Sequence, residues 1–220
     1  MFGHILLAAA LATASPAPVA SPQLKTIATV RASARCSQIV THANDAIVLA
    51  LDDNRVIAQT ITQLRLTNLD DGNPIHRYNA LNALRDLASS LDKQSSSGAA
   101  DIARLRDLAA HSPDPVQQKE LKSFADALGG ALGRQLKMAR DLNGYIAYVD
   151  YSGMRGRMDS GSAFDQGFSE DPFTPQALRS RNSATAYAQN AAADFQTRLP
   201  LIVRDEDTAQ THEDAAFGGC

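Results

Sequence analysis

Apolar side chains recur at alternating steps of four and three residues along most of this chain. This spacing places them on one face of an α-helix and is typical of helices that pack against one another in bundles and coiled coils. The first such stretch begins with a short pattern of apolar residues, Leu24, Ile27 and Val30, which is out of phase with the longer seam that follows. Together they predict one helix over 24–69. The long seam consists of Cys36, Val40, Ala43, Ile47, Ala50, Asn54, Ile57, Ile61 and Leu64.

A serine-rich stretch, SSLDKQSSSGAADI at 89–102, interrupts the leucines of the second segment and looks like a linker between two domains. However, Leu91 and Ile102 keep the same helical phase across it. Because a linker has no reason to conserve that phase, the spacing predicts one helix over 74–111, which begins at an Asn-Pro pair. The alternative is a helix that breaks near Gly98, since glycine costs up to about 1 kcal/mol relative to alanine in a helix.

Two further helices are predicted after the second. The third covers 115–151, begins at an Asp-Pro pair and carries a leucine- and alanine-rich seam. Residues 152–173 are rich in glycine, serine and aspartate and have no periodicity, so they predict a loop before a shorter fourth helix over 175–199. Pro200 predicts the end of that helix, and the acidic composition of 201–220 predicts a disordered tail.

Together these elements predict an all-α fold in which one domain, 24–200, is an antiparallel bundle of three long helices and a shorter fourth. Short turns between long helices make sequence neighbours antiparallel. Folding the chain about its turns places Asn54 and Gln135, the polar members of two seams, in one layer of the core. The same alignment places residues 95–98 opposite the glycines at 129–130. A buried amide pair fixes the register of the helices, and the alternative is a hollow polar layer that binds a small ligand.

The N-terminus is typical of an export signal. Residues 1–14 contain a short apolar core that ends in Ala-Thr-Ala, the small residues that a signal peptidase recognises, and cleavage as late as residue 21 is the alternative. A Pro- and Ala-rich linker follows at 15–23. No basic residue precedes the apolar core, and the competing interpretation is a disordered tail. We expect the protein to be exported, either to the periplasm or out of the cell.

The chain has 2 cysteines, Cys36 within the first helix and Cys220 at the end of the predicted tail. In an oxidising compartment the two can form a disulfide. The alternatives are that Cys36 is a small apolar core residue and that Cys220 is a free thiol able to link two chains, so an oligomer is compatible with the sequence.

Composition and motifs argue against several classes of function. A formal net charge of −3 gives no bias towards nucleic acid. The 5 histidines lack the spacing of zinc or di-iron bundles, and the chain has no P-loop, dinucleotide or haem-attachment motif. We therefore expect no catalytic residues, no metal, no cofactor and, after removal of the signal, no segment that spans a membrane.

Aromatic and arginine side chains gather around the predicted loop. Side chains of these two types are common in recognition surfaces, and the alternative is that the aromatic rings fold back and cover the end of the bundle. The candidate interaction residues are Tyr148, Tyr151, Arg155, Arg157, Phe164 and Phe168.

The sequence thus favours an exported, non-enzymatic helical bundle that binds another protein or a surface in the cell envelope. The second hypothesis is a small-ligand-binding or sensory bundle that uses the polar layer around Asn54 and Gln135. A cavity between the first three helices would favour the second hypothesis, and a solid core with an exposed aromatic loop would favour the first.

Overall fold

The computed structural model describes residues 24–27, 33–67, 69, 73–158, 175–218 and 220, with the backbone alone for 151–158 and 175–183. Within these residues the chain forms four α-helices and no strand: α1 (Ala34–Leu66), α2 (Pro74–Ala110), α3 (Pro115–Met158) and α4 (Pro175–Phe217). The predicted all-α bundle is confirmed. At 1.5 Å per residue, the 44 residues of α3 form a rod of about 65 Å.

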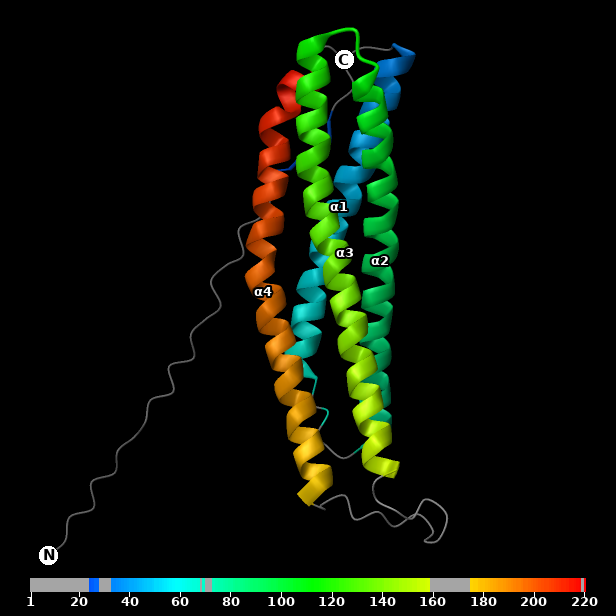
Figure 1. Ribbon diagram of the computed structural model, residues 1–220, viewed down its shortest axis with the longest axis vertical. Helices are drawn as coiled ribbons and strands as arrows, with labels where there is room; N and C mark the ends of the chain where they lie inside the picture. Colours follow the sequence, from blue (N-terminus) through cyan, green and yellow to red (C-terminus); the bar gives the residue numbers. More distant parts are fainter. Residues whose placement is uncertain (1–23, 28–32, 68, 70–72, 159–174, 219) are drawn as a thin grey trace, which may run out of the picture.

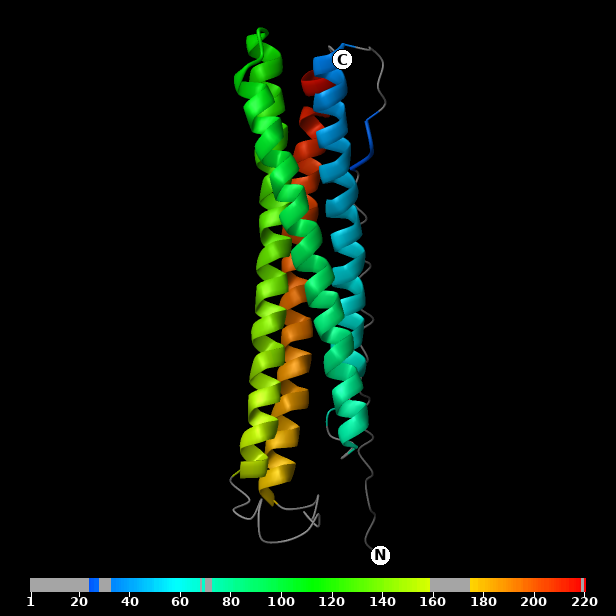
Figure 2. The ribbon, with the colours of Figure 1, turned by 90° about the vertical axis from the view of Figure 1, so that its right-hand side faces the viewer.

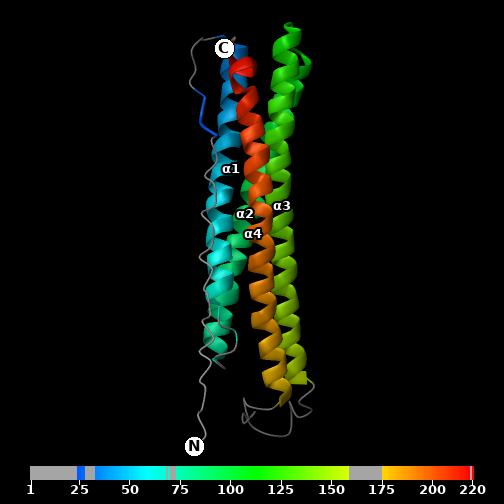
Figure 3. The same cartoon turned by 90° about the vertical axis from the view of Figure 1, so that its left-hand side faces the viewer.

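The helices run up and down alternately along one long axis, with α3 between α2 and α4 in the view of Figure 1. Each helix packs on its neighbours in sequence, and α1 also packs on α4, which closes the bundle. In the turned view of Figure 2, α2 lies beside α1 at one end of the bundle and crosses to lie beside α3 at the other. Figure 3 shows the start of α1 and the end of α4 side by side at the end where the C-terminus lies.

Short polar side chains begin the first three helices, and those of the second and third are the Asn-Pro and Asp-Pro pairs that the sequence suggested. The Ser33 hydroxyl accepts a hydrogen bond from the Cys36 amide at 3.1 Å, and the Asn73 side chain accepts one from the Ile75 amide at 2.9 Å. Asp114 accepts from the amide of the second residue of α3 at 2.9 Å. These bonds satisfy N–H groups that have no partner within the helix.

Helix α2 runs without interruption through the serine-rich stretch, as its phase predicted. Ser95 and Gly98 both face the core, and Ser95 is fully buried. A Cβ atom at Gly98 would lie 2.8 Å from a methyl carbon of Leu132 in α3. The glycine therefore allows close contact between α2 and α3 at a point where other residues would push them apart.

The first helix begins later than predicted, at Ala34 instead of residue 24. Residues 24–27 are not helical, and the side-chain amide of Asn44 pairs with both backbone groups of Ile27, at 2.7 Å to its N–H and 3.0 Å to its C=O. Leu24 is nonetheless buried, with 4% of its surface exposed. The shift of phase upstream of Cys36 reflects this change from helix to a segment that packs along the bundle.

The third helix is longer than predicted, since it continues through Met158. Ser152 and the two glycines that follow it within 152–158 therefore do not start a loop, and the backbone at Arg155 and Arg157 is helical. The remainder of the predicted loop, from 159 to 173, lies outside the described residues.

The predictions of a short fourth helix and a disordered tail are wrong: α4 continues through Pro200 to Phe217. Proline removes one helical hydrogen bond, a loss that costs about 3 kcal/mol in a helix interior, but Pro200 is exposed, and one face of the helix beyond Leu201 is buried. Ile202 and Ala209 are fully buried, and the Phe217 ring packs edge-on against Phe124 with centroids 5.0 Å apart. Burial of this apolar face outweighs the lost bond and the acidic composition.

No helix in the described part of the chain is both long enough and apolar enough to cross a membrane.

Candidate functional site

A layer of polar side chains crosses the middle of the bundle and divides its core. One hydrophobic cluster extends along α1 from Cys36 to Ala50, and a second extends from Ile57 to Leu64. Residues from all four helices occupy the interval between these clusters. This polar layer consists of Asp53 and Asn54 of α1, Ser95 of α2, Gln135 of α3 and Glu206 of α4.

Asn54 connects α1 to both α3 and α4. Its amide nitrogen donates to the two carboxyl oxygens of Glu206, at 2.8 and 3.0 Å, and its oxygen accepts from Gln135 at 2.9 Å. The same Gln135 nitrogen also donates to the carbonyl of Ala50 at 2.9 Å. This arrangement orders three helices at one level, as a single buried polar residue does in a coiled coil.

Asp53 connects α1 to α2 in the same layer. The Ser95 hydroxyl donates to one carboxyl oxygen of Asp53 at 2.6 Å, and both side chains are fully buried. The other oxygen, Oδ1, has no hydrogen-bond partner, nor does Oε1 of Gln135. A buried polar atom without a partner costs about 1–3 kcal/mol, so a proton on Oδ1 of Asp53, or a donor beside either oxygen, would stabilise the structure.

The two carboxyl groups of the layer both have raised pKa values. Burial raises the pKa of Asp53 to about 7, although the Ser95 hydrogen bond opposes the rise, and the nearby charge of Asp52 adds to it. Burial likewise raises the pKa of Glu206 to about 7, against the effect of the Asn54 hydrogen bond. Removal from water penalises the charged form of an acid, and both groups are fully buried.

The structure brings Asn54 and Gln135 together, in the layer where the sequence placed them. Sequence reasoning missed Asp53 and Glu206, which carry the charge of that layer. Asp53 lies on a second run of steps of four and three beside the seam through Asn54, and that run consists of Ile39, Ala43, Ala46, Ala50, Asp53 and Ile57. Glu206 also had a periodic signal, because the steps of three and four continue from Leu199 past Pro200 to Ile202, Glu206, Ala209, Glu213 and Ala216.

The predicted alignment of α2 was displaced by about a turn. Gly98 lies against Leu132, not against the glycines at 129–130, and a Cβ at Gly129 would lie 3.0 Å from Ile102. The helices are staggered along the bundle axis and are not mirrored about the centres of their turns. For that reason the turn positions correctly predicted that α2 packs on α3 but not which residues of the two helices lie opposite one another.

The two cysteines form a disulfide between the start of α1 and the end of the chain. Cys36 and Cys220 are 184 residues apart in sequence, and their Cα atoms are 5.1 Å apart. The bond fixes the last turn of α4 to α1, so it closes the bundle instead of attaching a loose tail.

Of the candidate interaction residues, the structure describes the side chain of Tyr148. It is 51% exposed and lies beside Tyr187 of α4, whose ring centroid is 5.0 Å away. Tyr187 also stacks on the buried ring of Tyr145 at 5.4 Å. The side chains of Tyr151, Arg155 and Arg157 are not described, and Phe164 and Phe168 lie outside the described residues.

Exposed apolar side chains are concentrated at the same end of the bundle as this tyrosine cluster. At that end α1 finishes, α2 begins, α3 finishes and α4 begins (Figure 1). The exposed large side chains near it are Leu66, Ile75, Tyr78, Tyr148 and Tyr187, with Val48, Val116 and Leu201 elsewhere among the described residues.

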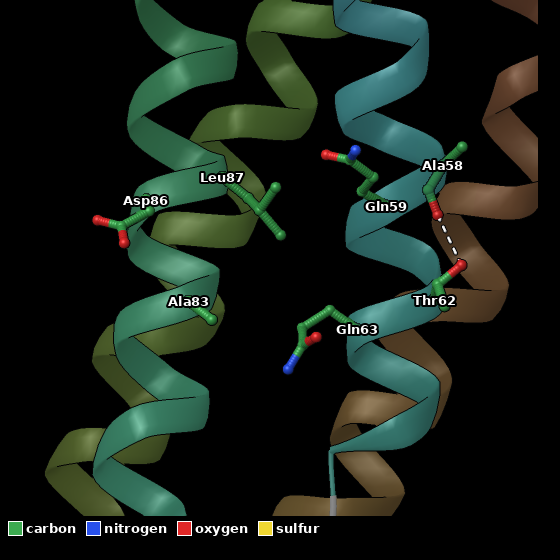
Figure 4. Close-up of a pocket in the computed structure, with 7 residues that line it drawn as sticks. All are labelled: Ala58, Gln59, Thr62, Gln63, Ala83, Asp86 and Leu87. Atoms are coloured by element: carbon green, nitrogen blue, oxygen red, sulfur yellow. Dashed lines mark hydrogen bonds between the residues drawn. The ribbon is translucent and has the colours of Figure 1, made fainter.

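The two best-formed hollows on the surface of the described residues are not lined by any residue of the polar layer. One is an open groove between α1 and α2, into which Gln59, Gln63 and Leu87 project (Figure 4). The other is lined by residues that include His42 and Arg104. A ligand-sized cavity at the polar layer, which would favour the small-ligand hypothesis, is not among these hollows.

One further cluster of polar side chains was not anticipated. His42 and Asp45 of α1 and Asp101 of α2 place ligand atoms within 4.8 Å of one another. Nδ1 of His42 lies 2.9 Å from Asp101, and this pair joins the two helices at a partly exposed position. A hydrogen-bonded His–Asp pair accounts for the arrangement.

A comparison with protein-family models, curated proteins and solved structures finds no match to this chain.

Proposed function

We propose that this chain is an exported, non-enzymatic helical bundle that binds another protein or a surface in the cell envelope, through the end that carries the tyrosine cluster. The observation that carries the proposal is the concentration of exposed apolar and tyrosine side chains at that end. Tyrosine provides a large contact area at low conformational cost and is enriched in binding hot spots.

The tyrosine cluster is already ordered before any partner arrives. Tyr187 lies between Tyr145 and Tyr148, with centroid distances of 5.4 and 5.0 Å. Its own surface is 45% exposed and that of Tyr148 is 51% exposed. Rings that are held by their neighbours lose little freedom on binding, which favours affinity.

The disulfide supports export. A bond between Cys36 and Cys220 persists in an oxidising compartment and is rare in a reducing one. It agrees with the signal-like composition of 1–14. Mass spectrometry of the protein from its native host tests this part of the proposal, because we expect an N-terminus near residue 15 and an intact disulfide.

Site-specific photo-crosslinking in the native host tests the binding end directly. A photoreactive phenylalanine analogue at Tyr148 or Tyr187 should yield a discrete crosslinked product. The same analogue at Val116, which is 63% exposed in the first turn of α3, should not. The two variants differ in which end of the bundle carries the probe, so Val116 is the matched control.

A second variant distinguishes binding from chance proximity. Tyr148→Ala should abolish the crosslink formed from position 187 while the circular dichroism of the bundle stays unchanged. Equal products from position 116 and from the tyrosines, or none from either, would refute the proposed binding end.

A further inference from the structure

The polar layer contains two buried carboxyl groups that have no role in the proposed binding end. Asp53 and Glu206 both have no exposed surface, and no described basic side chain forms an ion pair with either. Two unpaired charges in a core are very costly. The amide and hydroxyl donors around them contribute hydrogen bonds but no positive charge.

The charged residues that act on the two layer carboxyls are all acidic, although Asp52 is itself paired with Arg55 at 2.7 Å. Asp52 of α1 acts on Asp53, while Asp205 and Asp207 of α4 act on Glu206, and the two layer carboxyls repel each other. From α2 and α3 the neighbours are Ser95 and Gln135, which do not titrate. The nearest arginine of α3, Arg134, is paired with Asp205 at 2.7 Å.

Protonation of the two carboxyl groups removes the negative charge of the layer. Oδ1 of Asp53 and Oε1 of Gln135 are both buried and without donors. A proton on Asp53 turns an orphan acceptor into a donor, and a proton on Glu206 removes the second charge. The layer is then neutral and keeps its hydrogen bonds from Ser95 and Asn54.

We propose that the polar layer is a proton-operated joint between the two halves of the core. With Asp53 and Glu206 protonated, the layer connects all four helices. With both deprotonated, mutual repulsion and the cost of buried charge loosen the helices at this level, while the two hydrophobic clusters keep each half folded.

The pH range follows from the direction of the pKa shifts. Both carboxyls have pKa values of about 7 in the folded protein, raised from 3.8 and 4.5. Between the ordinary and the raised values the folded state holds protons that the unfolded state has released. The stabilisation from this source is complete below the ordinary values and is lost as the pH rises through about 7.

Amide hydrogen exchange on the intact, disulfide-bonded protein tests the joint. From about pH 5 to about pH 8, protection factors in 50–57 and 202–209 should fall at least tenfold, since each unit of pKa shift is a tenfold change in the opening equilibrium. Protection in 36–43, which belongs to the hydrophobic cluster that extends along α1 from Cys36 to Ala50, should fall less. The double variant Asp53→Asn, Glu206→Gln, which cannot ionise in the layer, should lose this difference between segments.

A matched control carries the same chemical change at the surface. Asp92 is exposed on α2, one turn before Ser95, and Asp92→Asn should show the pH dependence of the wild type. If the double variant and the wild type lose protection equally, or if 36–43 opens as much as 50–57, the joint does not exist.

A measurement on the wild type alone covers the case in which the double variant fails to fold. Unfolding at about pH 6 should release protons, because the folded layer holds them and the unfolded chain does not. Calorimetry in two buffers of different ionisation enthalpy counts them. No net release at this pH would overturn the proposal.

Discussion

The substitution Asn54→Leu should destabilise the protein much more at high pH than at low pH. Asn54 makes three hydrogen bonds in the layer, two from its nitrogen to Glu206 at 2.8 and 3.0 Å and one from Gln135 to its oxygen at 2.9 Å. Leucine fills a similar space but offers no donor to the carboxyl group. The loss therefore depends on whether Glu206 carries charge when its donors are removed.

The magnitude follows from that difference. At about pH 5 Glu206 is protonated in both proteins, and the cost is that of neutral groups left without partners, about 1–3 kcal/mol. The Asn54 hydrogen bond lowers the pKa of Glu206, so its removal raises that pKa further. At about pH 8 the cost grows by about 1.4 kcal/mol for each unit of that rise. A penalty of several kcal/mol at high pH is a large part of the stability of a small domain.

Urea unfolding followed by circular dichroism at the two pH values measures the effect. Gln135→Leu should cost about 1–3 kcal/mol, and the double variant should cost less than the sum, since the two side chains share a hydrogen bond. Asn79→Leu, an exposed amide of α2, serves as the control and should change stability by less than about 0.5 kcal/mol. Equal penalties at both pH values together with simple additivity would refute the description of the layer.

Three other predictions concern the fold. Gly98→Ala should destabilise by about 1–3 kcal/mol, because its Cβ would meet Leu132 at 2.8 Å, whereas Gly133→Ala, with nothing within 4 Å, should stabilise by up to about 1 kcal/mol in the same unfolding assay. Cys36→Ser should lower the free energy of unfolding by about 2–5 kcal/mol with little loss of helix content, and an unchanged midpoint would mean that the disulfide does not form. Deletion of 201–220 should abolish the cooperative unfolding transition, because it removes the buried end of α4, and a stable truncated protein would contradict the assignment of that end to the core.

The sequence was most informative where packing repeats along a helix. The phase shared by Leu91 and Ile102 outweighed the three serines and one glycine between them, because a helix is determined by the face that it buries more than by local propensity. The same reasoning located Asn54 and Gln135 in one layer. Periodicity therefore predicted the bundle and placed two of the five residues of its polar layer.

Prediction from the sequence failed where a local signal was given more weight than that periodicity. Pro200 and the acidic composition of 201–220 argued for an end and a tail, although the seam continued through Ile202 and Ala209. The error concealed Glu206, and with it the reason for Asn54, whose amide donates to that carboxyl. Register along the bundle was also beyond the sequence, since the stagger of α2 depends on close contacts such as that between Gly98 and Leu132.

Titration of the two buried carboxyl groups in the folded protein tests the proton-operated joint most directly. Carbon-13 NMR of the side-chain carboxyl signals, assigned with Asp53→Asn and Glu206→Gln, follows each group through the pH range. The proton-operated joint requires midpoints of about 7 for both groups, with the folded bundle intact. Midpoints near the ordinary values of 3.8 and 4.5 would show that both groups are charged at neutral pH, and the proton-operated joint would be excluded.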